Sequence, residues 1–295
     1  MDNKISYPQL WQSLTPLYDE GEAKAVVRML LEERFGMTFT DICCGKVEEL
    51  SADDRQQLEA LMARLRQGEP VQYVLGETYF CGRRFGVAPG VLIPRPETED
   101  LCRTVKSYHN TPFCALQPPA PLQVLDVGTG SGCIAVTLAL DLFNAEVTAW
   151  DVSGDALVIA RDNAHRLGAK VNLEWHDILD TQEDDRQWDI IVSNPPYIAR
   201  RERADMSPHV LDHEPELALF VPDDDPLLFY RAIGSYAART LKAGGWLYFE
   251  INPLYAEELR EMLTQLGFGQ VLLQKDRFGK LRFCKANILF KTPRR

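Results

Sequence analysis

The sequence predicts an α/β protein with a mostly parallel sheet, preceded by a small domain of helices. Three observations predict this architecture. From residue 122 onward, short apolar runs of strand length alternate with segments whose apolar residues recur every three or four positions. Before residue 70, only the helical spacing occurs. Between residues 73 and 88, aromatic residues, glycines and short alternations replace it, a pattern typical of a hairpin or an extended linker.

The first expected domain covers residues 1–70 and is helical. Its apolar residues at helical spacing fall into three groups: Leu10, Leu14 and Leu17; Val26, Val27, Leu30 and Leu31; and Leu58, Leu61, Met62 and Leu65. Ser51 precedes acids at 53 and 54, which is typical of a helix N-cap, and Gly68 and Pro70 end the helix that follows. We expect this domain to help dock a protein substrate. A hairpin linker is expected over residues 71–90.

The second expected domain covers residues 91–295 and alternates strands with helices. Strands are expected at 122–127, 146–150, 171–175, 189–192, 246–251, 271–275 and 282–290. Helices are expected at 133–140, 155–167, 227–241 and 255–266. Strands that alternate with helices pair mostly in parallel, with helices on both faces of the sheet.

Composition is that of a soluble globular protein. The chain has 295 residues, of which 45% are hydrophobic and 25% charged. It has no apolar window of membrane-spanning length and no apolar core of signal-peptide length near its start. Its seven cysteines include no C-x-x-C pair, which favours reduced thiols over a disulfide framework or a metal site. We therefore expect a cytoplasmic protein with no membrane partner and no metal.

The net charge argues against a nucleic-acid partner. It is −11 in total, with −4 before residue 91 and −7 after it, so both parts of the chain are acidic. No basic stripe that could follow a phosphate backbone is evident. We expect no direct contact with nucleic acid.

A glycine-rich loop follows the first predicted strand of the second domain. It reads G-x-G-x-G instead of the G-x-G-x-x-G of dinucleotide folds, and an acid precedes it. That carboxylate would repel a pyrophosphate and attract an ammonium or a sulfonium, which favours S-adenosylmethionine over NAD. The candidate cofactor-binding residues of this loop are Asp126, Gly128, Thr129, Gly130, Ser131 and Gly132.

Two further acids follow the next two strands. Asp151 comes 19 residues after Gly132, where an acid accepts the ribose hydroxyls of a nucleotide. Asp177 follows the third strand and could accept the adenine amino group. A solvated loop acid is nearly as good an interpretation of Asp177.

The fourth strand ends in an N-P-P-Y turn formed by Asn194, Pro195, Pro196 and Tyr197. An amide or exocyclic amine nitrogen is a poor nucleophile because its lone pair is delocalised. The Asn194 side-chain oxygen and the Pro195 carbonyl could hold its N–H groups, while the prolines fix that carbonyl at little entropic cost. Tyr197 could stack on a planar group. The turn therefore predicts methylation of a planar nitrogen, with Asn194, Pro195 and Tyr197 as catalytic residues.

With this glycine loop and this N-P-P-Y turn, the chain resembles the PrmC/HemK family, the peptide-chain-release-factor glutamine methyltransferases. The most selective match is residues 92–99, which read Leu-Ile-Pro-Arg-Pro-Glu-Thr-Glu, and the match is close from about 68 to 251. The resemblance implies a class I S-adenosylmethionine-dependent methyltransferase fold, Rossmann-like, with an antiparallel last strand and a small N-terminal helical domain. It also implies that S-adenosylhomocysteine is the product.

The implied substrate is the glutamine of the Gly-Gly-Gln loop in class 1 release factors, methylated on its side-chain amide nitrogen. Cofactor contacts carry over to the glycine loop, Asp151 and Asn194, and substrate contacts to Asn194, Pro195, Pro196 and Tyr197. Members of the family can carry a Trp after the third-strand acid. Here Ile178 stands at that position, so it is a cofactor contact without aromatic stacking.

Three alternative functions remain. A glutamine methyltransferase for a ribosomal protein resembles V-P-R-S-P where this chain reads I-P-R-P-E-T-E. A DNA adenine methyltransferase shares the N-P-P-Y turn, but this chain is acidic and lacks a target-recognition domain. A cofactor-binding module without activity is separated from an enzyme only by turnover.

Two polar groups near these motifs have competing interpretations. His209 and His213 are four residues apart, but Pro208 and Pro215 flank them, so we expect a polar loop and no helix or metal site. Arg95 and the acids at 97 and 99 either shape the substrate mouth or cap a helix that begins near Thr98.

Overall fold

The computed structural model describes residues 5–110, 120–180 and 185–289, so Cys114 lies outside the described residues. The chain divides into two compact units. The first consists of Met1–Thr78 together with Ser207–His213, and the second of Tyr79–Met206 together with Glu214–Arg295. Each unit has its own buried apolar core.

The first unit is built from short helices around one core. Its helices are α1 (Tyr7–Gln12), α2 (Glu20–Phe35), α3 (Phe39–Cys43), η1 (Lys46–Glu49), α4 (Ala52–Arg66), α5 (Val71–Leu75) and α9 (Pro208–His213). The predicted N-cap is present, because the Ser51 hydroxyl accepts the backbone N–H of Asp54 at 3.1 Å. Leu30, Leu58 and Met62 are fully buried in this core.

Helix α9 corrects one expectation, since residues 208–213 form a helix where a polar loop was predicted. Pro208 is its first residue, where the missing N–H would have no helical partner in any case. The ring of His209 stacks on Tyr18 with centroids 4.2 Å apart, and its Nδ1 lies 3.0 Å from the Gly68 carbonyl. His209 therefore packs on the first unit, although it follows the N-P-P-Y turn in the sequence. No group of metal-ligating side chains occurs among the described residues.

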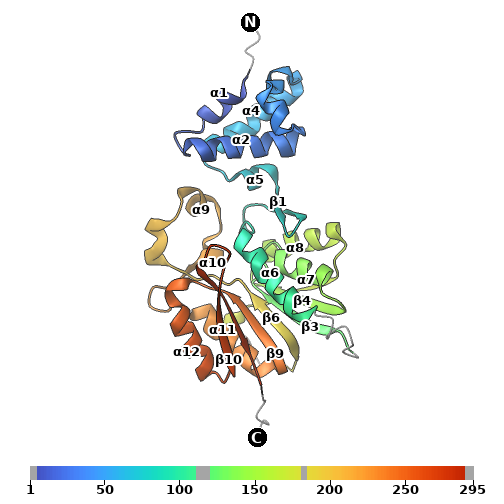
Figure 1. Cartoon of the computed structure of the whole chain (residues 1–295), viewed down its shortest axis with the longest axis vertical. Coiled ribbons are helices and arrows are strands. Elements are labelled where there is room, and N and C mark those ends of the chain that lie inside the picture. Colours follow the sequence, from blue (N-terminus) through green and yellow to red (C-terminus); the bar gives the residue numbers. More distant parts are fainter. Residues whose placement is uncertain (1–4, 111–119, 181–184, 290–295) are drawn as a thin grey trace. The chain divides into compact units, whose positions relative to one another are not determined.

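The second unit contains a seven-stranded sheet with the order β10-β11-β9-β6-β3-β4-β5 (Figure 1). Its strands are β3 (Leu122–Val127), β4 (Ala145–Asp151), β5 (Val171–Trp175), β6 (Trp188–Ser193), β9 (Leu241–Glu250), β10 (Gln270–Lys275) and β11 (Leu281–Asn287). Strand β11 is antiparallel to both neighbours, and the remaining pairs are parallel. The predicted mostly parallel sheet with an antiparallel last strand is confirmed.

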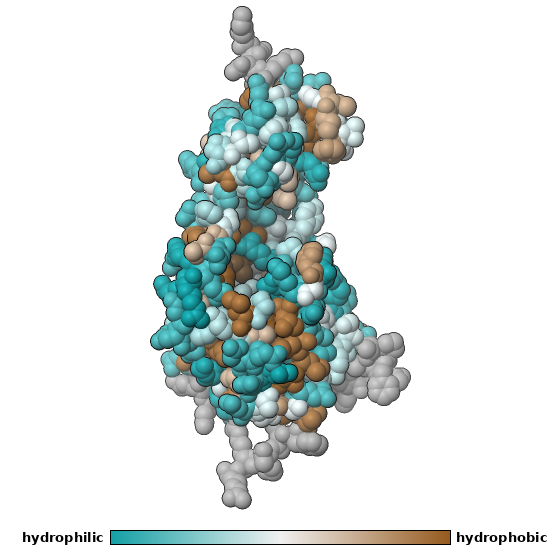
Figure 2. Space-filling model, turned by 60° about the vertical axis from the view of Figure 1, so that its left-hand side comes forward, coloured by the Kyte–Doolittle hydropathy of each residue, from teal (hydrophilic) through white to brown (hydrophobic). Residues whose placement is uncertain are grey.

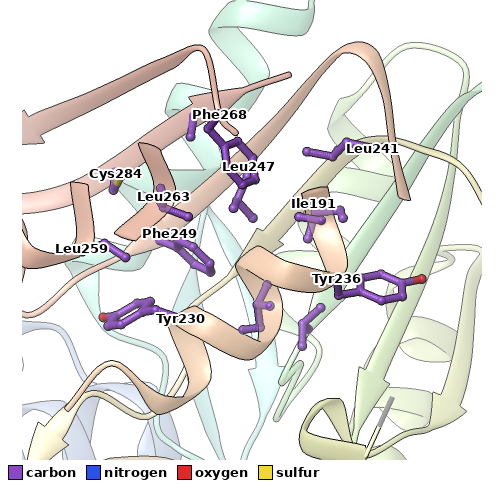
Figure 3. Close-up of a cluster of buried hydrophobic side chains, with 14 of the residues drawn as sticks. Ile191, Tyr230, Tyr236, Leu241, Leu247, Phe249, Leu259, Leu263, Phe268 and Cys284 are labelled. Atoms are coloured by element: carbon purple, nitrogen blue, oxygen red, sulfur yellow. The ribbon is translucent and has the colours of Figure 1, made fainter. Parts of the chain in front are cut away.

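Helices cover both faces of this sheet (Figure 1). One face carries α6 (Pro96–His109), α7 (Cys133–Asp141) and α8 (Gly154–Leu167), and the other carries α11 (Leu228–Thr240) and α12 (Ala256–Gln265). Successive side chains of each strand supply opposite cores, so Val124 faces the first set of helices and Leu125 the second. Figure 3 shows the second core, with Tyr230 and Tyr236 of α11 and Leu263 of α12 packed near Leu247 and Phe249 of β9.

Smaller elements connect these layers. Strands β1 (Glu77–Phe80) and β2 (Arg83–Gly86) form a separate two-stranded sheet, and β7 (Ile198–Ala199) pairs with β8 (Phe220–Val221). Short helices are η3 (Ile178–Asp180), η4 (Arg200–Asp205), α10 (Glu216–Leu219) and η5 (Pro253–Tyr255). Phe80 and Phe85 of the hairpin pack edge to face, with centroids 5.8 Å apart, inside the core on the α6 side.

The strand order creates a switch point next to β3. From β3 the chain proceeds to β4 and β5 on one side, whereas β6 and β9 follow on the other. In open α/β sheets ligands bind beyond the carboxyl ends of the strands at such a point. The candidate active site lies at this switch point.

The face of the molecule that Figure 2 shows is mostly polar. In the view of Figure 2, hydrophilic residues cover most of the surface, and hydrophobic residues gather in a few areas among them. None of the helices within residues 5–110, 120–180 and 185–289 has the length and apolar character needed to cross a bilayer.

Gly132 allows the glycine loop to pack closely on α8. Its φ is +80°, and a Cβ at this position would lie 3.1 Å from the Ala160 Cβ and 3.2 Å from the Ala160 Cα. We expect Gly132→Ala to lower the free energy of unfolding by about 1–2 kcal/mol because of the left-handed backbone, and by a further ~1–3 kcal/mol because of the clash. Gly168→Ala is the matched control, because Gly168 has φ +71° and nothing within 4 Å of a Cβ. Equal melting temperatures for the two variants would contradict the close packing.

Candidate active site

A cavity of about 290 Å³ opens in the second unit beyond the carboxyl ends of β3, β4 and β6. Residues from several parts of the sequence line it. They include the segment before α6 and its first turn (Val91, Leu92, Pro94, Arg95 and Thr98), the glycine loop (Gly128, Thr129, Gly130 and Ser131), the ends of β4 and β5 (Asp151, Val152, His176, Asp177 and Ile178) and the N-P-P-Y turn (Asn194, Pro195 and Pro196). Pro215, Leu217 and Phe229 add apolar wall.

The glycine loop bends around the end of β3. Gly128 and Gly130 have φ of +73° and +55° with nothing within 4 Å of a Cβ, so backbone conformation and not space requires glycine there. The N–H groups of Gly128 and Thr129 both donate to the Trp150 carbonyl at 2.9 Å. Strand β4 therefore holds the loop. Gly132, in contrast to Gly128, Thr129, Gly130 and Ser131, is not on the cavity wall and serves the packing of α8.

Asp151 ends β4 on the cavity wall. Its Oδ2 accepts the N–H of Gly130 at 2.8 Å, and its Oδ1 accepts the N–H of Ser153 at 2.9 Å. Burial raises the pKa of this carboxyl, although the two backbone hydrogen bonds act to lower it. Each oxygen keeps a second lone pair, so the carboxylate can accept hydrogen bonds from a ligand as well.

Asp126 lies behind the glycine loop and does not line the cavity, where the sequence analysis expected it. Its Oδ2 accepts the Thr129 hydroxyl at 2.6 Å and the Ala135 N–H at 3.2 Å. Its Oδ1 has no hydrogen-bond partner among the described residues. Burial raises the pKa of Asp126 to about 7. Because the polar partners are Thr129 and the start of α7, this acid supports the loop from beneath.

The end of β5 contributes three neighbouring residues to the wall. Asp177 accepts the Leu179 N–H at 2.9 Å, which turns the chain into η3, and Ile178 packs partly against the core beside α11. His176 stacks on Trp150 with centroids 3.9 Å apart. The sequence did not indicate His176 as a residue of the site, because a histidine at a strand end has no distinguishing spacing.

The N-P-P-Y turn is divided between the cavity and the core. Asn194, Pro195 and Pro196 line the cavity, whereas Tyr197 does not. The Tyr197 hydroxyl donates to Glu250 Oε1 at 3.1 Å, and its carbonyl accepts the Asn252 side chain at 3.1 Å. Burial and the neighbouring Glu250 carboxyl raise the pKa of Tyr197. Tyr197 is therefore tied to the end of β9 instead of standing free to stack on a substrate.

Arg95 points toward the cavity and pairs with a buried acid. Its guanidinium donates to Glu214 Oε1 at 2.5 Å, while the N–H of Ile93 donates to Glu214 Oε2 at 3.1 Å. The Glu214 side chain is 1% exposed. Arg95 stands at the N-cap position of α6, but its side chain makes no cap hydrogen bond. Arg95 therefore lies at the cavity, as the first interpretation expects, whereas the acids at 97 and 99 lie in the first turn of α6, as the capping interpretation expects.

Two residues that sequence analysis did not assign to the site hold the N-P-P-Y turn. Thr98 donates its hydroxyl to Glu250 Oε2 at 2.7 Å and accepts the Asn194 side-chain N–H at 3.3 Å. Glu250 is buried, which raises the pKa of its carboxyl. The one available signal was an acid at the end of an otherwise apolar strand over 246–251.

The fold and the cavity define a class of protein. The strand order with its single reversed strand, and the glycine loop followed by an acid after the next strand, are those of a class I S-adenosylmethionine-dependent methyltransferase. A 16S rRNA methyltransferase of T. thermophilus, solved with AdoMet and guanosine, has the same fold with a TM-score of 0.51 and 19% identity. The match covers 72% of this chain and 49% of that one.

Sequence comparison resolves the class to a family. Residues 114–213 match the methyltransferase small domain, and residues 12–76 match the PrmC N-terminal domain. The release factor glutamine methyltransferase of Bacteroides thetaiotaomicron is 44% identical over 94% of this chain and 96% of its own. That of Flavobacterium psychrophilum is 40% identical over 95% of this chain and 96% of its own. The chain belongs to the release factor glutamine methyltransferase family.

Proposed function

We propose that this enzyme transfers a methyl group from S-adenosylmethionine to the side-chain amide nitrogen of the glutamine in the Gly-Gly-Gln loop of class 1 release factors. The observation that carries the proposal is the position of Asn194. Its side chain lies on the cavity wall with its N–H held by Thr98, which leaves its oxygen as an acceptor for a substrate N–H.

The cavity has the chemical groups that S-adenosylmethionine requires. Asp151 can accept the ribose hydroxyls, the backbone of Gly128–Ser131 can approach the ligand closely, and Asp177 with Ile178 can hold the adenine. When bound, the cofactor supplies a methyl group that is activated by its attachment to a positively charged sulfur. Leu217 and Phe229 add apolar wall to the same space.

The protein's own contribution is the orientation of the target amide. The Asn194 oxygen and the Pro195 carbonyl accept its two N–H groups and hold the nitrogen with its lone pair directed at the methyl group. Two fixed acceptors also stabilise the nitrogen as it becomes positive during transfer. No protein base is needed, because the methylated nitrogen loses its proton readily to water.

The deciding experiment is direct. The chain of 295 residues is incubated with labelled S-adenosylmethionine and, in parallel reactions, with a purified class 1 release factor, with ribosomal proteins and with DNA, and the modified peptide or base is identified by mass spectrometry. Label on the Gly-Gly-Gln glutamine is the expected result. Label on a ribosomal protein or on DNA adenine instead would favour one of the alternatives. Cofactor binding without transfer to any of these substrates would favour a module without activity.

We also propose that the helical domain, residues 1–70, docks the protein substrate. A chain that starts at Gly68 is expected to bind S-adenosylmethionine as the full chain does, because every residue of the cavity belongs to the second unit. It should methylate an intact release factor more slowly. A short Gly-Gly-Gln peptide serves as the control substrate, with equal rates expected for both chains. Equal rates on the intact factor would contradict a docking role.

A further inference from the structure

Three buried or half-buried polar side chains connect the end of β9 to the catalytic turn. Glu250 is 2% exposed and does not line the cavity, whereas Thr98 and Asn194 do. The Thr98 hydroxyl lies 2.7 Å from Glu250 Oε2, and the Asn194 Nδ2 lies 3.3 Å from the Thr98 oxygen. The other carboxylate oxygen, Oε1, accepts the Tyr197 hydroxyl at 3.1 Å. Glu250 thus contacts the turn by two routes.

The chemistry of these groups sets the direction of each hydrogen bond. A carboxylate only accepts, so Thr98 and Tyr197 must each use their single hydroxyl hydrogen to donate to it. The Thr98 oxygen then has only lone pairs to offer. It can accept the amide N–H of Asn194, but it would repel the amide oxygen. The Asn194 amide is therefore held with its nitrogen toward Thr98.

We propose that Glu250, acting through Thr98, fixes the orientation of the Asn194 amide so that its oxygen faces the substrate nitrogen. Thr98 and Glu250 are positioning residues in this proposal, which rests on the proposed function. A flipped Asn194 would present an N–H donor to the N–H groups of the target amide and could not hold them. The relay thereby ensures that the catalytic amide has the required polarity before the substrate arrives.

The test removes the relay without changing its shape. Thr98→Val replaces the hydroxyl by a methyl group of the same size, and Thr98→Ser keeps the hydroxyl as the matched control. We expect the single-turnover rate of Thr98→Val at saturating S-adenosylmethionine to fall roughly ten-fold. This fold-change corresponds to the free energy that one polar hydrogen bond contributes. The KM for the release factor should change less than kcat, and Thr98→Ser should stay near the wild-type rate.

Glu250→Gln is a second variant, which is informative even if Thr98→Val does not fold. A glutamine at 250 has the same shape but carries an N–H₂ group that can donate to Thr98. The Thr98 hydroxyl is then free to donate to the Asn194 oxygen, which favours the flipped amide. Because Glu250 does not line the cavity, a fall in kcat with unchanged cofactor affinity is expected to arise through the N-P-P-Y turn, which Glu250 contacts by way of Thr98 and Tyr197, and not through direct contact with a ligand.

A double-mutant cycle distinguishes the relay from general damage. If Thr98 acts only through Asn194, adding Thr98→Val to Asn194→Ala should lower the rate no further. Independent, multiplying effects would overturn the relay, and so would a wild-type rate in Thr98→Val. A wild-type chain that transfers no methyl group to a release factor would overturn the proposed function itself, and the relay with it.

Discussion

Asn194→Ala is expected to lower the rate of methyl transfer on the order of a hundred-fold or more, as the loss of one preorganised polar contact at a developing charge does elsewhere. The substitution removes one of the two acceptors that hold the target nitrogen. The Pro195 carbonyl alone cannot fix the rotation of the substrate amide, so the reactive geometry is populated less often. The measurement is single-turnover transfer at saturating S-adenosylmethionine.

Cofactor affinity should change much less in this variant, because the glycine loop and Asp151 remain in place. Asn194→Asp is the informative companion. It keeps an acceptor oxygen but loses the N–H₂ that donates to Thr98 and adds a charge, so partial activity indicates that acceptance dominates. A wild-type rate in Asn194→Ala would remove the proposed mechanism and leave the N-P-P-Y turn a structural feature only.

Asp151→Ala is expected to weaken S-adenosylmethionine binding by roughly ten- to a hundred-fold. Hydrogen bonds to a charged group contribute about 1.5–3 kcal/mol, which corresponds to that range. Titration calorimetry measures the change directly. Unchanged affinity in a folded variant would show that Asp151 is not the ribose ligand.

The loss of the Asp151 carboxylate is also expected to affect the glycine loop. Asp151 also accepts the backbone N–H groups of Gly130 and Ser153, so its loss leaves the glycine loop without that support. Asp151→Asn separates the two effects, since an amide oxygen can still accept one backbone N–H while the charge is absent. An affinity for Asp151→Asn close to that of Asp151→Ala would assign most of the loss to the charge.

Much of the α/β architecture could be predicted because its signals are local. Apolar runs of strand length, helical spacing and the glycines at 128, 130 and 132 all depend on residues within a few positions of one another. The same holds for the N-cap at Ser51, which the structure confirms. Local rules were wrong at Pro208, where a proline begins a helix, because position within a helix decides whether a proline is tolerated.

The candidate site was predicted where residues follow a strand directly. Gly128, Asp151, Asp177 and Asn194 all come to the cavity because the carboxyl ends of parallel strands meet at one edge. The direction in which an individual side chain points was harder to predict from the sequence. Asp126 and Tyr197 are close to the cavity in sequence, yet each turns toward the core to bond a buried partner. The hydrogen bonds to these buried partners, and not the motif, decide that Asp126 and Tyr197 do not face the cavity.

The sequence by itself determined the strands of the main sheet, their order along the chain and the residue types of the loop and turn, since each depends on spacing along the chain. Only the tertiary structure decided which distant residues support them. Thr98 meets Glu250 across 152 positions and Asn194 across 96. His209 contacts the Gly68 carbonyl of the first unit across 141 positions. Such contacts follow no period along the chain, because they arise from the order in which strands enter the sheet and from the packing of its helices.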